Sequence, residues 1–189
     1  MSVQSPKMRA SHLHATIESL ACLGEEQEKL VRSHCSDIID RIDEVRTGWL
    51  PLPIAARLVQ SIEEICGREA SLLLAHESME RSMRGTLLGP IFDGLIRLGL
   101  GPEHGLRRVP AGWNLVYRDC GSISCESQSG SATLRLTSAP IEMRQDSYLH
   151  GIGSSLCGIV TVLGGDITDI TVNTDEVDVR YELRWVRRA

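Results

Sequence analysis

Two histidines lie within apolar helical patterns in the first half of the chain. His34 and His76 each fall in a stripe of residues spaced three or four apart, and Met79 follows His76 in the same stripe. A neutral imidazole on such a face can bind a metal or a ligand in an internal cavity. It can equally be a hydrogen-bonded core residue. With Trp49, in a proline-bounded loop, these residues are the predicted ligand-binding set: His34, His76, Met79 and Trp49.

Other reactive residues have spacings that argue against a site. His12 and His14 are two apart on a helix, which points them in different directions. Cys120 and Cys125 flank a turn, but no CxxC or CxxH pair accompanies them as a zinc site requires. No GxSxG elbow is present, so nothing supports hydrolase chemistry. The sequence therefore predicts no metal site and no catalytic residue.

A glycine-rich segment near residue 151 resembles the start of a GxGxxG phosphate motif. The third glycine position holds Leu156, and the glycines fall inside a helical pattern instead of after a strand. These small residues instead predict a face that lets the helix lie close to the sheet or to another helix: Gly151, Gly153, Ser154, Ser155 and Gly158.

Composition excludes several classes of partner. The net charge of -5 and the isoelectric point near 5.7 give no surplus of cations for a phosphate backbone, so nucleic acid is not expected. The longest uncharged stretch, 147–165, contains serines, a histidine and glycines and is too polar to span a membrane.

The cysteines lie in apolar patterns typical of reduced, buried thiols. Without an apolar run of signal-peptide length at the N-terminus, we expect a cytoplasmic protein.

The periodicity changes from helical to alternating along the chain. Helices are predicted at 11–24, 30–45 (as one helix or as two broken near Ser36), 53–66, 68–83 and 91–98. Strands follow at 113–117, 122–126 and 132–137, then a helix at 148–163 and strands at 167–172 and 177–185 around a turn at 173–176. This order predicts an α+β fold, with N-terminal helices followed by a βββαββ antiparallel sheet region. We expect one domain over 1–189, helical over 9–100 and containing the sheet over 109–187.

Short motifs along the chain resemble known families. The chain is similar to an uncharacterised, highly paralogous bacterial family in four segments: Trp49-Leu50-Pro51-Leu52, Gly85-Thr86-Leu87-Leu88-Gly89, Val109-Pro110 and Tyr181-Glu182-Leu183-Arg184-Trp185. Its element order resembles a superfamily of heme-dependent nitric oxide sensors, four-vinyl-reductase-type small-molecule domains and TRAPP vesicle-tethering subunits. Heme-binding members carry a tyrosine, serine and arginine motif for the propionates, which Tyr117-Arg118-Asp119-Cys120 does not reproduce. From this difference we expect no heme and no other cofactor.

The resemblance implies ligand binding or protein assembly. The predicted function is a non-enzymatic binding module in signalling or regulation, either a sensor for a small apolar ligand or an assembly subunit. The alternative is an enzyme acting on a small apolar or tetrapyrrole-like substrate in an internal pocket. The number of apolar helical stripes further predicts a dimer with a second copy or a related protein.

Overall fold

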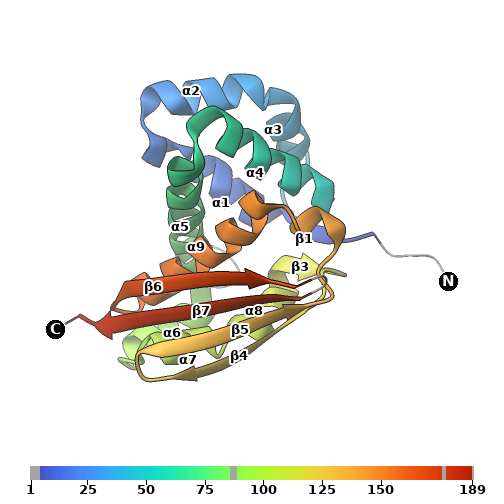
Figure 1. Cartoon of the computed structure of the whole chain (residues 1–189). Coiled ribbons are helices and arrows are strands. Elements are labelled where there is room, and N and C mark those ends of the chain that lie inside the picture. The colour runs from blue at the N-terminus through green and yellow to red at the C-terminus, as the bar shows by residue number, and fades with distance from the viewer. Residues whose placement is uncertain (1–4, 86–88, 176–177, 189) are drawn as a thin grey trace.

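The first half of the chain is mainly helical. The computed structural model describes residues 5–85, 89–175 and 178–188. Its N-terminal helices form the upper part of the molecule in Figure 1, together with a short 3-10 turn, Leu20–Leu23. They are α1 (Ala10–Ser19), α2 (Glu25–His34), α3 (Ser36–Asp43), α4 (Leu52–Cys66) and α5 (Arg68–Gly85). The predicted break near Ser36 is confirmed, because α2 and α3 are separate helices.

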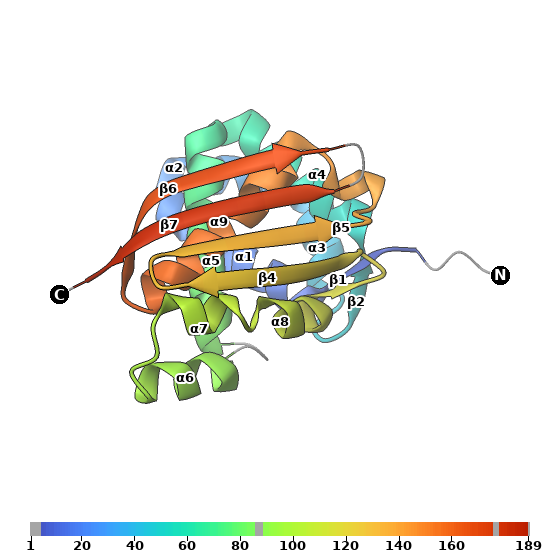
Figure 2. The same ribbon diagram turned by 60° about the horizontal axis from the view of Figure 1, so that its bottom comes forward.

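Two antiparallel sheets accompany the helices. A three-stranded sheet in the order β2-β1-β3 joins Lys7–Arg9 (β1), Trp49–Pro51 (β2) and Tyr117–Arg118 (β3). A larger sheet has the order β4-β5-β7-β6 and consists of Ser122–Gln128 (β4), Ser131–Thr137 (β5), Gly165–Thr174 (β6) and Val179–Arg187 (β7). One face of the larger sheet covers the helices, and the other is open to the viewer in Figure 2.

Short helices connect the two halves. They are α6 (Gly89–Arg97), α7 (Pro102–Leu106) and α8 (Val109–Val116), and Figure 2 shows them beside the β4 edge of the larger sheet. After β5 come a 3-10 turn, Ile141–Met143, and the long helix α9 (Asp146–Val162). No helix in the described ranges is long and apolar enough to cross a membrane.

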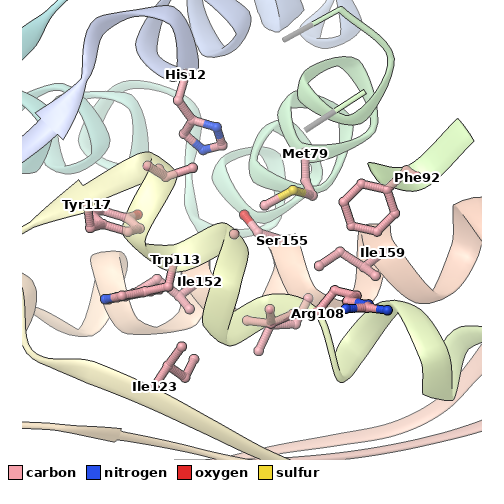
Figure 3. Close-up of a pocket in the computed structure, with 14 residues that line it drawn as sticks. His12, Met79, Phe92, Arg108, Trp113, Tyr117, Ile123, Ile152, Ser155 and Ile159 are labelled. Atoms are coloured by element: carbon pink, nitrogen blue, oxygen red, sulfur yellow. The ribbon is translucent and has the colours of Figure 1, made fainter. Parts of the chain in front are cut away.

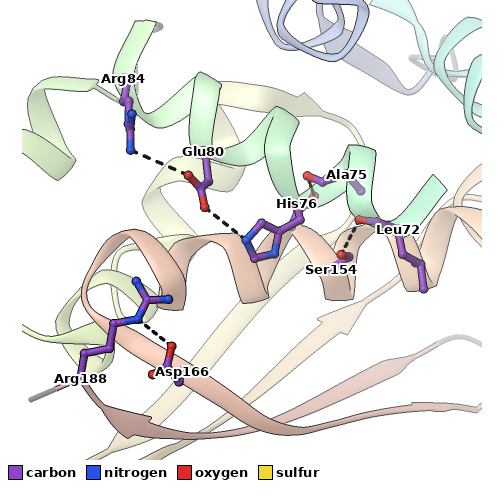
Figure 4. A network of polar contacts seen from close by, with 9 residues as sticks. Leu72, Ala75, His76, Glu80, Arg84, Ser154, Asp166 and Arg188 are labelled. Carbon is purple, nitrogen blue, oxygen red and sulfur yellow. Dashed lines mark hydrogen bonds and ion pairs between the residues drawn. The ribbon is translucent and has the colours of Figure 1, made fainter. Parts of the chain in front are cut away.

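Helix α9 is the centre of the molecule, and its small residues explain how it fits there. It packs against α5 on one side and against β6 and β7 on the other. The Ser154 and Ser155 hydroxyls donate to the Leu72 and Ala75 carbonyls of α5 at 2.7 and 3.2 Å, as Figure 4 shows for this helix pair. A Cβ on Gly158 would lie 2.9 Å from the His76 carbonyl oxygen. The predicted small-residue face is therefore confirmed.

The predicted α+β class is confirmed, with several local differences. The order β3, β4, β5, α9, β6, β7 reproduces βββαββ, but the predicted strand 113–117 is wrong. Its residues up to Val116 belong to α8, because Pro110 sits in the first helical turn and Trp113 and Val116 bury the same face three residues apart. The predicted loop at Trp49 contains strand β2.

Some predictions fall at the margins of the described residues. Thr86, Leu87 and Leu88 of the quoted family segment, and the end of the predicted turn 173–176, lie outside the described ranges. Buried residues of the helical and sheet-containing parts form one contiguous hydrophobic core. That 1–189 is a single domain stays a prediction.

Candidate functional site

An apolar pocket lies between the helical part and the larger sheet. We call it the interlayer pocket. Its walls come from α1, α5, α6, α8, β3, β4 and α9, which gather residues far apart in the sequence (Figure 3): His12, Met79, Phe92, Arg108, Val109, Gly112, Trp113, Val116, Tyr117, Ile123, Ile152, Ser155, Leu156 and Ile159. The space between the walls is about 660 Å³ when its open mouth is included, and the volume open to the centre of a water-sized molecule is about 70 Å³.

His12 is the most distinctive polar residue of this pocket. Its side chain extends from α1 toward the pocket in Figure 3, and only 9% of the residue is exposed. Burial lowers the pKa of His12 to about 4, so the imidazole is neutral at neutral pH. Its Nδ1 lies 3.0 Å from the Ser82 hydroxyl of α5. In the tautomer with hydrogen on Nδ1, that group donates to Ser82 and the Nε2 lone pair is left to bind a metal or accept a hydrogen bond.

Aromatic rings form one wall of the pocket. The rings of Trp113 and Tyr117 lie 4.2 Å apart between centroids at 34°, and Phe92 contributes from α6. The Trp113 Nε1 group is buried without a hydrogen-bond partner among the described residues. Buried N–H groups are nearly always paired, so this wall is left with an unsatisfied donor. The exposed Arg108 is the charged residue in the lining.

A second cavity, the helical pocket, continues on the other side of His12. It shares with the interlayer pocket the four residues His12, Tyr117, Ile152 and Ser155. Tyr148 lines the helical pocket and donates to the Tyr117 hydroxyl at 3.5 Å. Burial raises the pKa of both tyrosines, so both hydroxyls stay protonated. His12 and Tyr117 thus form a partition between the two cavities.

The four residues predicted to bind ligand do not lie together. Met79 lines the interlayer pocket. His76, three residues earlier, lines neither cavity and has Nε2 at 3.2 Å from Glu80, which also pairs with Arg84 (Figure 4). His34 is exposed at the end of α2, where Nδ1 lies near the Leu30 carbonyl. Trp49 lies on β2 outside both cavities. Ligand binding by any of these residues remains a prediction.

The sequence analysis did not predict His12 as a site residue. Its spacing from His14 argues only against a shared metal, and the half-buried His14 instead lies 3.4 Å from Asp43. A better signal was the serine series of α5, because Ser71, Ser78 and Ser82 recur at helical spacing and are all buried. Small polar residues at that spacing predict a closely packed partner helix with polar groups facing them, and α1 places His12 there.

The cysteines and carboxylates do not form a competing site. In the described part of the chain, no group of three His, Cys, Asp or Glu residues is placed to hold a metal ion. All six cysteines are free thiols, but the prediction that they are buried is wrong for Cys22, which is exposed. Burial raises the pKa of Cys120 and of Cys157 to about 11, so both stay protonated.

Two solved structures share this architecture. No protein-family model and no curated protein matches the sequence. A Cs H-NOX mutant with an unnatural amino acid superposes with a TM-score of 0.64 at 10% identity, covering 96% of this chain and 98% of the other. A point variant of Tt H-NOX gives a TM-score of 0.61 at 10% identity, covering 96% and 97%.

The chain has an H-NOX-like fold. The predicted likeness to heme-NO-binding sensors is therefore confirmed at the level of fold. Similarity to the paralogous bacterial family, to four-vinyl-reductase-type domains and to TRAPP subunits stays a prediction.

The expectation of no cofactor is wrong. The two solved structures that share the fold are H-NOX domains, a heme-binding class, and this likeness contradicts the expectation. The expectation rested on the missing propionate motif at Tyr117-Arg118-Asp119-Cys120. That motif concerns one edge of a heme, whereas most of the contact surface in such a site is apolar.

Proposed function

We propose that this chain is a ligand-binding sensor module whose ligand is a flat, largely apolar molecule held in the interlayer pocket. The observation that supports this most is His12, a neutral imidazole buried between two apolar cavities. Burying a polar group costs free energy unless it is paired. An imidazole retained at this place is suited to contact a polar atom or metal at the centre of an apolar ligand.

Heme is the leading candidate ligand, on the strength of the fold and of the lining residues. The His12 imidazole is the candidate iron ligand, the aromatic wall of Phe92 and Trp113 suits a porphyrin face, and Arg108 is available for a carboxylate. A bound heme would supply an iron able to take up a diatomic gas. His12, Phe92, Trp113 and Arg108 are not part of the tyrosine, serine and arginine motif that binds the heme propionates in the resembled superfamily. The proposal is therefore argued from the side chains that line this pocket.

The size of the pocket limits which ligands fit without a change in side-chain positions. Ligand sites for molecules of drug size usually enclose about 300–1,000 Å³. The space of about 660 Å³ includes the open mouth, while only about 70 Å³ is open to the centre of a water-sized molecule. The pocket as it stands therefore suits a small apolar molecule, whereas a porphyrin requires side chains to move. Met79 is suited to this, because its unbranched side chain adapts to irregular spaces.

Hemin titration followed by absorbance tests the proposal. We expect a saturable Soret band for the wild-type protein and its loss in His12→Ala, because the iron loses its imidazole. His14→Ala is the matched control, since His14 lies on the same helix but contacts Asp43 and the Val45 carbonyl at the surface. His12→Gln separates loss of the iron ligand from loss of the fold. Its amide can keep a hydrogen bond to Ser82 but is a poor iron ligand.

Variants of His34 and His76, the two histidines predicted from sequence to bind ligand, sharpen the result. His34→Ala and His76→Ala should keep the band. A band that survives in both His12 variants but vanishes in His76→Ala would contradict the proposed ligand and restore the prediction from sequence. If wild-type protein gives neither a Soret band nor saturable binding of a small apolar fluorescent dye, the sensor proposal fails. The alternative function, an enzyme acting in the same pocket, would be tested by turnover of a bound ligand.

A further inference from the structure

The three-stranded sheet gathers cations on its outer face. Arg9 pairs in register with Trp49, and Lys7 pairs with Arg118. Residues directly opposite each other share a face, as do residues two apart on a strand. Met8, between the two β1 cations, points inward and is buried. Lys7, Arg9, Trp49 and Arg118 therefore share the opposite face. The short strands lie at the end of the molecule from which the N-terminal segment leaves (Figure 1).

Trp49 holds two of these cations in place. The guanidinium carbons of Arg9 and Arg118 lie 4.7 and 4.4 Å from the centroid of the Trp49 ring. Both distances are within the range of a cation–π interaction, which favours arginine over lysine. The two guanidinium groups are thus brought close to one ring despite their mutual repulsion.

No carboxylate in the described part of the chain neutralises this group. Among the described residues, the side chains of Lys7, Arg9 and Arg118 form neither an ion pair nor a hydrogen bond, whereas Arg32, Arg180 and Arg188 each pair with an acid. The Arg9 Nε group is buried and has no acceptor in the described structure. Buried donors are nearly always paired, so the Arg9 Nε–H is an unsatisfied donor within an uncompensated cluster of cations.

We propose that Arg9 and Arg118, held on Trp49, form a docking site for the carboxylates of an acidic segment of a partner protein. Guanidinium groups present parallel N–H donors that match a carboxylate, and the ring orders them before binding. The chain's net charge of -5 disfavours an extended polyanion such as nucleic acid or an anionic membrane, but not a short acidic segment at a local cluster of cations. This site goes beyond the interlayer pocket and does not depend on the ligand there.

Titration of the ¹⁵N-labelled protein with a blocked tetraglutamate peptide tests the site. We expect saturable shifts of the Trp49 indole N–H and of the Arg9 and Arg118 Nε–H signals. Arg118→Gln should weaken binding about tenfold, as loss of a charge-assisted hydrogen bond predicts. Trp49→Leu keeps every charge but removes the ring, and should weaken binding about three- to fivefold. Arg118 is exposed, so its replacement should leave the fold intact.

Arg135→Gln is the matched control for net charge. Arg135 is exposed on β5 and has no side-chain partner in the described structure, so this variant should bind the peptide within about twofold of wild type. An equal loss in both arginine variants would show nonspecific attraction and overturn the proposal. So would the absence of saturation up to about 10 mM peptide. Tighter binding of inorganic phosphate, duplex DNA or phosphatidylserine vesicles than of the peptide would overturn the assignment to a carboxylate partner.

Discussion

The protonation of His12 should make the protein lose stability in mild acid. The folded protein holds the pKa of His12 at about 4, against 6.5 for an unperturbed histidine, because burial disfavours the imidazolium. Between these values the unfolded chain binds more protons than the folded one, so stability falls as the pH falls from about 6.5 to about 4. Above this window His12 is neutral in both states, and its full contribution to stability is present.

The magnitude follows from the shift. The difference between 6.5 and about 4 is about 2.5 pKa units, and each unit corresponds to about 1.36 kcal/mol. The contribution lost on acidification is therefore about 3 kcal/mol, a large part of the free energy of unfolding of an ordinary domain. The polar side chains on the neighbouring helical turns, Thr16, Ser78 and Ser82, do not titrate in this range, and Tyr117 stays neutral because burial raises its pKa.

Urea unfolding followed by circular dichroism at a series of pH values measures this loss. The carboxylates of the chain also titrate in acid, so the informative quantity is the difference in free energy of unfolding between wild type and His12→Gln. Between about pH 7 and about pH 4, we expect the wild type to lose about 3 kcal/mol more free energy of unfolding than His12→Gln loses. Parallel pH profiles for the two proteins would refute a buried, neutral His12.

Packing and thiol chemistry give two further predictions. Gly158→Ala should lower the melting temperature by about 2–12 °C in a thermal scan, because the new Cβ meets a backbone carbonyl and overpacking costs about 1–3 kcal/mol. Gly151→Ala on the same helix, where the nearest atom would be 4.0 Å away, should leave it unchanged or raise it, and equal losses would contradict the close contact of α5 with α9. A thiol reagent should label the exposed Cys22 in native protein and reach the buried Cys120 and Cys157, whose pKa values are about 11, only after denaturation. Early labelling of either buried thiol, measured by peptide mass spectrometry, would contradict the packing around it.

The sequence predicted long elements well because their patterns extend over several turns or strand pairs. Helix α9 shows apolar residues at helical spacing and ends beside a glycine pair, and β7 alternates between buried and exposed residues. Short elements carry too few residues for a period to emerge. Strand β2 spans only Trp49–Pro51 and exists through its pairing with β1, which lies far away in the sequence.

Most residues of the candidate site could not be predicted from the sequence, because they come from separate helices and strands. Met79 lines the interlayer pocket, but most of the buried residues of α5 lie outside the predicted apolar stripe, and they are Ser71, Leu74, Ser78 and Ser82. Ligand binding by Met79 stays a prediction. The position of His12 depends on α1 crossing α5 so that the imidazole meets Ser82, which no local pattern specifies. The contacts of the Trp49 ring with Arg9 and Arg118 depend on the register of three short strands, which no local pattern predicts, and ligand binding by Trp49 stays a prediction.

Anomalous scattering from iron in crystals of the hemin-loaded protein tests the central proposal most directly. The proposal predicts one strong iron peak inside the interlayer pocket, next to His12 Nε2 and between α1 and α8. An iron peak beside His34 or His76, or one only on the protein surface, would contradict the proposal that His12 and the interlayer pocket hold the ligand.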